Sequence, residues 1–139
     1  MTGSLSFLAP VGRVLLALIF ILSGFGKLSD PPGTAAYIES GGLPGFLVWP
    51  TIVVEIGGGA LVALGLFTRP AAIVLAAFTV VAGVLYHFFP AQSAEGMQAM
   101  MQMIQFQKNI SITGGLLFLA AMGPGAFALG AGRASLSRA

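Results

Sequence analysis

One acidic residue stands alone inside a long apolar stretch of the sequence. Glu55 is the only charged residue between Leu43 and Thr68, and that stretch is long enough to cross a bilayer. A carboxylate at this depth is costly in hydrocarbon, so it is expected to face the interior of a helix bundle, where such groups carry protons, ions or ligands. The alternative is a structural role, as one half of an ion pair or as a protonated, hydrogen-bonded acid. We favour the functional interpretation.

Two cations lie on one face of the helix expected to precede this stretch. Arg13 and Lys27 are separated by fourteen residues, which is close to a whole number of helical turns. Arg13 lies about one turn inside the membrane boundary, and its side chain is long enough to extend toward Glu55. For either residue the alternative is a side chain that extends to the lipid headgroups. Together they favour a polar cavity inside the bundle.

A histidine is expected near the other end of a third apolar helix. His87 continues a stripe of small and mildly polar residues, which is typical of an inward face. The alternative is an interfacial aromatic residue, because its neighbours are tyrosine and phenylalanine. A metal site needs more ligands than one histidine and one distant glutamate, so no metal is expected.

Lys108 and Asn109 open the fourth apolar stretch. Before them, glutamines recur at helical spacing, and Gln105 shares a wall with Asn109 if this segment continues into the span. In that arrangement Lys108 enters the bundle and pairs with Glu55, His87 or a bound anion. Otherwise it is an ordinary interfacial lysine.

The elements that must position these groups follow from composition. Of 139 residues 57% are hydrophobic and 7% are charged, far below the roughly 25% charged residues of soluble domains. Four apolar stretches, at about 8–28, 44–67, 70–90 and 107–128, predict an all-α membrane protein, a four-transmembrane-helix antiparallel bundle forming a single domain over 1–139. Helices are expected because open strands would leave backbone groups unsatisfied in lipid. The absence of cysteine excludes disulfides and thiol redox chemistry. A net charge of +2 gives no reason to expect nucleic acid as a partner.

The charges between the stretches predict the orientation. One side carries only basic residues, and positive loops face the cytoplasm, so both termini are expected there. The first stretch is read as a retained span and not as a cleaved signal peptide. On the outer side, Asp30 and Pro31 begin a short helix that ends at Gly41, and a second helical segment extends the fourth span. The basic side holds Arg13, Arg69, Arg133 and Arg138, and the mixed side holds Lys27, Asp30, Glu39, Glu95 and Lys108.

In order and spacing, several segments resemble the DoxX family of small bacterial inner-membrane proteins. They are GRVLLALIFILSGFGKL, GTAAYIESGGLP, VEIGGGALVALGLFTR, HFFP and IQFQKNISITGGLLFLAAMGPG. The resemblance implies a four-helix bundle in the bacterial plasma membrane. It also implies an association with membrane redox or oxidative-stress proteins. The matching polar positions are Arg13, Lys27, Glu55, Arg69, His87, Lys108 and Asn109.

The leading functional hypothesis is a non-catalytic accessory subunit of a membrane redox system. It would bind a quinone-like or lipid ligand in a cavity lined by a polar cluster centred on Glu55. Two alternatives remain open: a small proton- or ion-coupled transporter or channel, and a structural or assembly protein. The expected surroundings are the lipid bilayer, membrane redox partners and, for a chain this small, further copies of itself. The predicted cluster is Glu55, His87, Lys108, Asn109, Arg13, Lys27 and Gln105.

Overall fold

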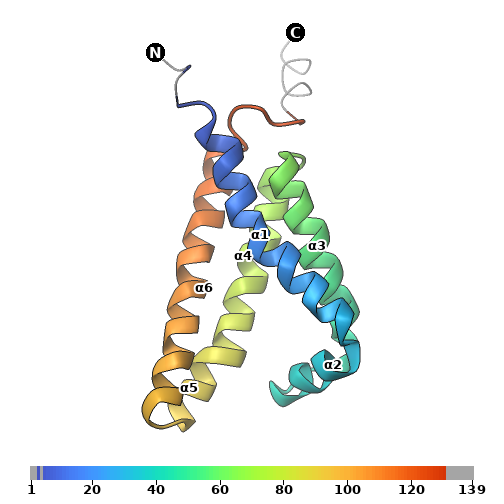
Figure 1. The fold of residues 1–139 in the computed structure, drawn as a ribbon, viewed down its shortest axis with the longest axis vertical. Helices are drawn as coiled ribbons and strands as arrows, with labels where there is room; N and C mark the ends of the chain where they lie inside the picture. The colour runs from blue at the N-terminus through green and yellow to red at the C-terminus, as the bar shows by residue number, and fades with distance from the viewer. Residues whose placement is uncertain (1–2, 4, 131–139) are drawn as a thin grey trace.

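The computed structural model describes residue 3 and residues 5–130, and every regular element in that part of the chain is a helix (Figure 1). The elements in chain order are α1 (Leu8–Ser29), α2 (Pro31–Ser40), the short 3₁₀ turn η1 (Gly45–Leu47), α3 (Val48–Leu64), α4 (Thr68–Gly83), the π-helical segment η2 (Val84–Phe88), α5 (Phe89–Ser93) and α6 (Gly96–Met122).

The long helices form two pairs. α1 packs along α3, α4 packs along α6, and the pairs meet mainly through α3 and α4. Figure 1 shows the four helices close together near the N-terminus and spread apart toward α2 and α5. We call the first region, with Arg13, Gly65 and residues 123–130, the closed end. The region with α2, η2 and the first half of α6 is the open end.

A small residue lets the two helices of the α1–α3 pair pack closely. Gly59 of α3 lies against α1, where an added Cβ would come within 2.8 Å of Ile21 and 3.3 Å of the Ala17 carbonyl oxygen. Such close approach lets helices gain packing contacts that lipid cannot offer. The core at this level contains Ala17, Phe20, Val62, Ala71, Ala72, Leu75, Ala76 and Leu116.

The two helical connections predicted from sequence, a short helix after the first span and a helical extension of the fourth, are confirmed. α2 begins where expected, because the Asp30 side chain accepts a hydrogen bond from the Gly33 amide at 3.0 Å, and Pro31 occupies its first position. It ends at Gly41, and Gly42 has a positive φ of 84°. The glutamine-striped segment is continuous with the last long helix, since α6 runs without a break from Gly96 to Met122.

The expected spans are only partly matched. Three helical stretches are long and apolar enough to cross a membrane, namely Leu8–Ser29, Gly45–Leu64 and Thr68–Ser93. The fourth span is expected to end at residue 128, but α6 already stops at Met122. Gly123 follows with a φ of 86°, and Pro124 comes next. The second also ends early, at Leu64, because Gly65 adopts the left-handed conformation. Arg133 and Arg138, used to predict the orientation, lie outside the described residues.

The third long stretch changes its helical geometry at the open end. α4 passes into the π-helical segment η2 at Val84, and α5 continues to Ser93, so the helix runs past the expected end at residue 90. π-helical turns are rare and occur frequently at functional sites. This one contains His87 and its neighbour Tyr86.

Candidate functional site

The partner of Glu55 is Lys27. Glu55 lies on α3 and is only 3% exposed, and the Lys27 side chain reaches it from α1. The Lys27 Nζ donates to Glu55 Oε1 at 3.0 Å and to Ser23 Oγ at 2.7 Å. It also lies 2.8 Å from Glu55 Oε2, as an ion-pair contact outside hydrogen-bond geometry. Oε2 is therefore attracted electrostatically by the Lys27 ammonium, but no described residue donates a hydrogen bond to it.

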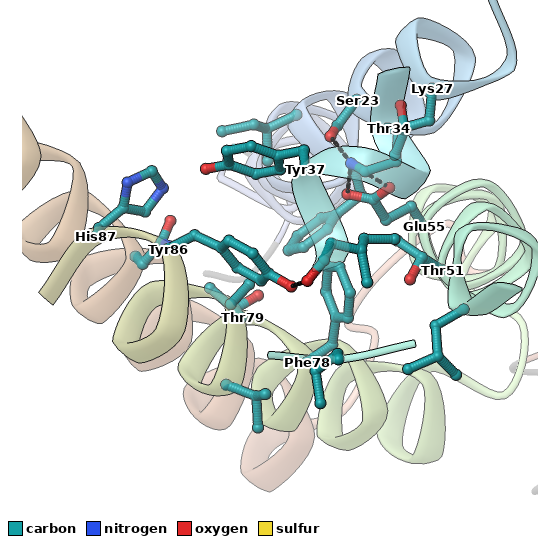
Figure 2. A pocket seen from close by; sticks show the side chains of 18 of the residues that line it. Ser23, Lys27, Thr34, Tyr37, Thr51, Glu55, Phe78, Thr79, Tyr86 and His87 are labelled. Carbon is teal, nitrogen blue, oxygen red and sulfur yellow. Dashed lines mark hydrogen bonds and ion pairs between the residues drawn. The ribbon is translucent and has the colours of Figure 1, made fainter. Parts of the chain in front are cut away.

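The Lys27–Glu55 pair faces a cavity between the two helix pairs. Figure 2 shows Ser23, Lys27 and Glu55 on one side of it and His87 on the other. Its volume is about 410 Å³, within the range of roughly 300–1,000 Å³ that small-molecule sites occupy. The surface of the walls is largely apolar, although about half of the lining residues carry a polar group. The apolar lining residues are Ile19, Phe20, Ile38, Leu43, Leu47, Pro50, Phe78, Val81, Ala82 and Ile112, and the polar ones are Ser23, Lys27, Thr34, Tyr37, Thr51, Glu55, Thr79, Tyr86, His87, Lys108 and Asn109.

A second polar group lies across the cavity, at η2 and α6. His87 Nδ1 lies 2.8 Å from Gln102 Oε1, and an amide oxygen only accepts, so Nδ1 carries the proton. In the neutral ring Nε2 is then an acceptor. Lys108 donates to Gln105 on its own helix and is exposed. Asn109 packs against Gly83 of α4, where an added Cβ would lie 3.1 Å from the Asn109 side chain.

Helix α2 forms part of the cavity wall at the open end of the molecule. Tyr86 of η2 donates a hydrogen bond to the Ile38 carbonyl oxygen at 2.9 Å and stacks on Tyr37, with ring centroids 4.8 Å apart. Gly41 makes room for the Tyr86 ring, because an added Cβ would lie 2.5 Å from it. Burial raises the pKa of Tyr37 above its ordinary value, so its phenol stays protonated and can donate. Tyr86 thus links the α4–α6 pair to α2.

Two of the seven predicted cluster residues lie away from the cavity. Arg13 is 3% exposed and donates to backbone carbonyl oxygens at the closed end: that of Pro124, that of Ala126 at 3.0 Å and that of Phe127 at 3.1 Å. Its guanidinium therefore fixes residues 124–127 and does not extend toward Glu55, contrary to expectation. Gln105 only supports Lys108. The cavity brings together the other five: Lys27, Glu55, His87, Lys108 and Asn109.

Sequence reasoning missed three residues at the site. Ser23 precedes Lys27 by one helical turn, so the i, i+4 spacing would have placed its hydroxyl beside the ammonium. Thr34 and Tyr37 are spaced three apart on α2, with Ile38 next, so one face of that helix was readable as inward. That this face turns over the cavity depends on the Tyr86 contact, which has no local signal.

The arrangement offers chemistry of a limited kind. A carboxylate and an imidazole on opposite walls can accept protons or hydrogen bonds from a bound molecule. Apolar side chains between them suit a flat ring. Within the described part of the chain, the acidic and histidine side chains do not gather into a group of three that could hold a metal ion.

Comparison with known proteins agrees with this architecture. The inner membrane protein YqjF of Escherichia coli is 40% identical over 119 residues, covering 86% of both chains. The inner membrane protein YphA of the same organism is 36% identical over 121 residues, covering 86% of this chain and 85% of the relative. CatD of Bacillus subtilis, whose name assigns it provisionally to the oxidoreductases, is 39% identical over 57 residues, or 41% of this chain and 42% of its own. No solved structure matches. The DoxX family model matches residues 8–88, which hold all of α1 to η2, and the chain therefore belongs to the DoxX family of membrane proteins.

Proposed function

We propose that this protein binds a quinone-like lipophilic molecule in the cavity beside Glu55, as an accessory subunit of a membrane redox system. The observation that carries the proposal is the cavity itself, of about 410 Å³, with apolar walls and the Lys27–Glu55 pair at one side. Phe20 and Phe78 line the same cavity and offer apolar faces on which a ring can pack. The oxidoreductase name of CatD supports the redox association.

The proposal includes an arrangement in the membrane. Four long helices cross the bilayer, with α6 as the fourth span, and both termini lie in the cytoplasm. Support comes from the three apolar stretches and from the inner membrane relatives. Arg13 and Arg69 belong to the closed end, where positive charge favours the cytoplasm. The open end, with α2 and the start of α6, then faces the periplasmic side.

Binding is favoured over conduction by the way the cavity ends. Between it and the closed end lies a packed core, in which Ala72, Leu75 and Leu116 are fully buried. A route for ions through the bundle would have to open this core. A purely structural role would fit a filled interior, with Glu55, His87 and Lys108 in one dry network. Instead, Glu55 pairs with Lys27 and the cavity separates it from His87.

Quinone binding to the purified full-length protein tests the proposal. Decylubiquinone and its reduced form, decylubiquinol, are titrated separately into protein in nanodiscs, and binding is followed by equilibrium dialysis and by the shift in melting temperature. We expect saturable binding of at least one form, and Glu55→Gln should weaken the form that binds more tightly. Gly57→Ala is the matched control on the same helix, because an added methyl there meets nothing within 4 Å. Absence of saturable binding, or equal binding by the Glu55→Gln protein, contradicts the proposal.

A further inference from the structure

The groups that remain unsatisfied around the cavity are mainly acceptors. Glu55 Oε2 is buried, and no described residue donates a hydrogen bond to it. An ionised carboxylate offers about four lone-pair sites, while the described protein supplies one hydrogen bond, from Lys27 to Oε1, and an ion-pair contact of 2.8 Å between the same ammonium and Oε2. A buried oxygen in this state gains free energy when a ligand donates to it.

His87 presents a second acceptor from the opposite wall. Its Nδ1 is engaged by Gln102 Oε1 at 2.8 Å, which leaves Nε2 of the neutral ring as a lone pair. His87 lines the cavity and is half-buried. A molecule lying between Glu55 and His87 therefore meets an acceptor at each of its ends.

The donors around the cavity do not offset this bias. The protons of Lys27 are directed at Ser23 and Glu55. Lys108 has protons to spare but is exposed, so water or lipid headgroups can accept them. Ser23, Thr51 and Tyr37 carry hydroxyls and Asn109 carries an amide, and all of these groups both donate and accept. Among the described residues that line the cavity, Glu55 Oε2 is the buried side-chain atom that has no hydrogen-bond partner.

We infer that the cavity selects the reduced, dihydroxy form of a quinone-like ring, the hydroquinone, over the oxidised form. A hydroquinone carries an O–H donor at each end of its ring, matching Glu55 on one wall and His87 on the other. A quinone carries two carbonyl acceptors, which would face these two acceptors and leave all four groups unpaired. The inference rests on the proposed function, because it assumes that such a ring occupies the cavity.

Comparing the two redox states of one ligand tests the inference. Decylubiquinol and decylubiquinone are titrated anaerobically into the full-length protein in nanodiscs. We expect the quinol to bind at least about tenfold more tightly, as for a hydrogen bond to a charged group. For a two-electron couple, each tenfold preference raises the midpoint potential of the bound ligand by about 30 mV, and a redox titration measures this independently. The dimethyl ether of the quinol, which cannot donate, is expected to bind like the quinone.

Variants assign the preference to the two acceptors. Glu55→Gln and His87→Phe should each lower the quinol-to-quinone ratio. Thr51→Val lines the same cavity and removes a hydroxyl that donates and accepts, so it should weaken both forms alike. Binding of neither form overturns the proposed function and this inference together. Equal binding, preference for the quinone, or a ratio unchanged in both acceptor variants overturns the inference alone.

Discussion

The closed and open ends each hold a cation from the same face of α1, buried at Arg13 and half-buried at Lys27, and they use it differently. Arg13 and Lys27 are about 21 Å apart along the helix at 1.5 Å per residue. Arg13 donates to neutral backbone carbonyl oxygens of residues 124–127. Lys27 meets a carboxylate at the wall of a cavity. A buried charge in a membrane helix therefore does not by itself mark a functional site; its partner and the space beside it decide.

The largest effect is expected at the closed end. Arg13→Met removes three charge-assisted hydrogen bonds and leaves carbonyl oxygens unpaired, which should lower the free energy of unfolding by about 4 kcal/mol. Thermal unfolding in detergent measures it. Arg13→Lys should recover only part of the loss, because an ammonium lacks the planar fork of donors. Ligand binding per folded molecule should stay unchanged; a specific loss of binding would break the division between the two ends.

At the open end, stability and binding should be separable. Lys27→Met leaves Glu55 buried without its cation, its side chain being only 4% exposed, and should cost about 3 kcal/mol. Lys27→Met combined with Glu55→Leu should regain most of that stability, because apolar replacement of a buried ion pair is often neutral. Both proteins should lose ligand binding. If the double variant is as unstable as the single one, the pair is mainly structural, as at Arg13.

Backbone packing gives a third contrast. Gly65→Ala, at the closed end, forces a side chain onto a φ of 73° and places Cβ 2.6 Å from that of Ala128. A cost of about 2 kcal/mol is expected in chemical or thermal unfolding. Gly57→Ala, in the open middle of α3, is the control and should stabilise the helix by about 0.5 kcal/mol. Equal effects at the two glycines would mean that residues 123–130 do not pack on the α3–α4 turn.

The smallest effect concerns α2. Tyr86→Phe removes the hydrogen bond to the Ile38 carbonyl oxygen and should cost about 1 kcal/mol. The loss should appear as faster amide hydrogen exchange in residues 31–40, with α1 and α3 unchanged. Tyr37→Phe keeps that bond and the stacked rings, so exchange in α2 should change less. A similar change in both variants would contradict the role of Tyr86 as the link between α2 and the other helix pair.

Much of the fold could be predicted because its signals are local. Apolar length gives the long helices, and Asp30, Pro31 and Gly41 mark the two ends of the ten-residue helix α2. The burial of Glu55 also follows from its neighbours along the chain. Its partner does not, because which cation reaches it depends on how α1 is rotated against α3. The carbonyl partners of Arg13 lie more than one hundred residues away in an irregular segment. Irregular backbone carries no periodic pattern from which such a contact can be predicted.

The π-helical segment η2 has a consequence for comparing this chain with its relatives. A π turn accommodates one residue more than an α turn inside a helix, so deleting one residue from Val84–Phe88 would restore α-helical bonding and leave the helix beyond it in nearly the same rotational phase. The family match ends at residue 88, the last of this segment. A homologue one residue shorter here would match this chain on both sides of the segment and differ in where the side chains inside it point. An alignment should therefore place the one-residue gap inside Val84–Phe88, because a gap placed elsewhere would pair residues that do not occupy the same place.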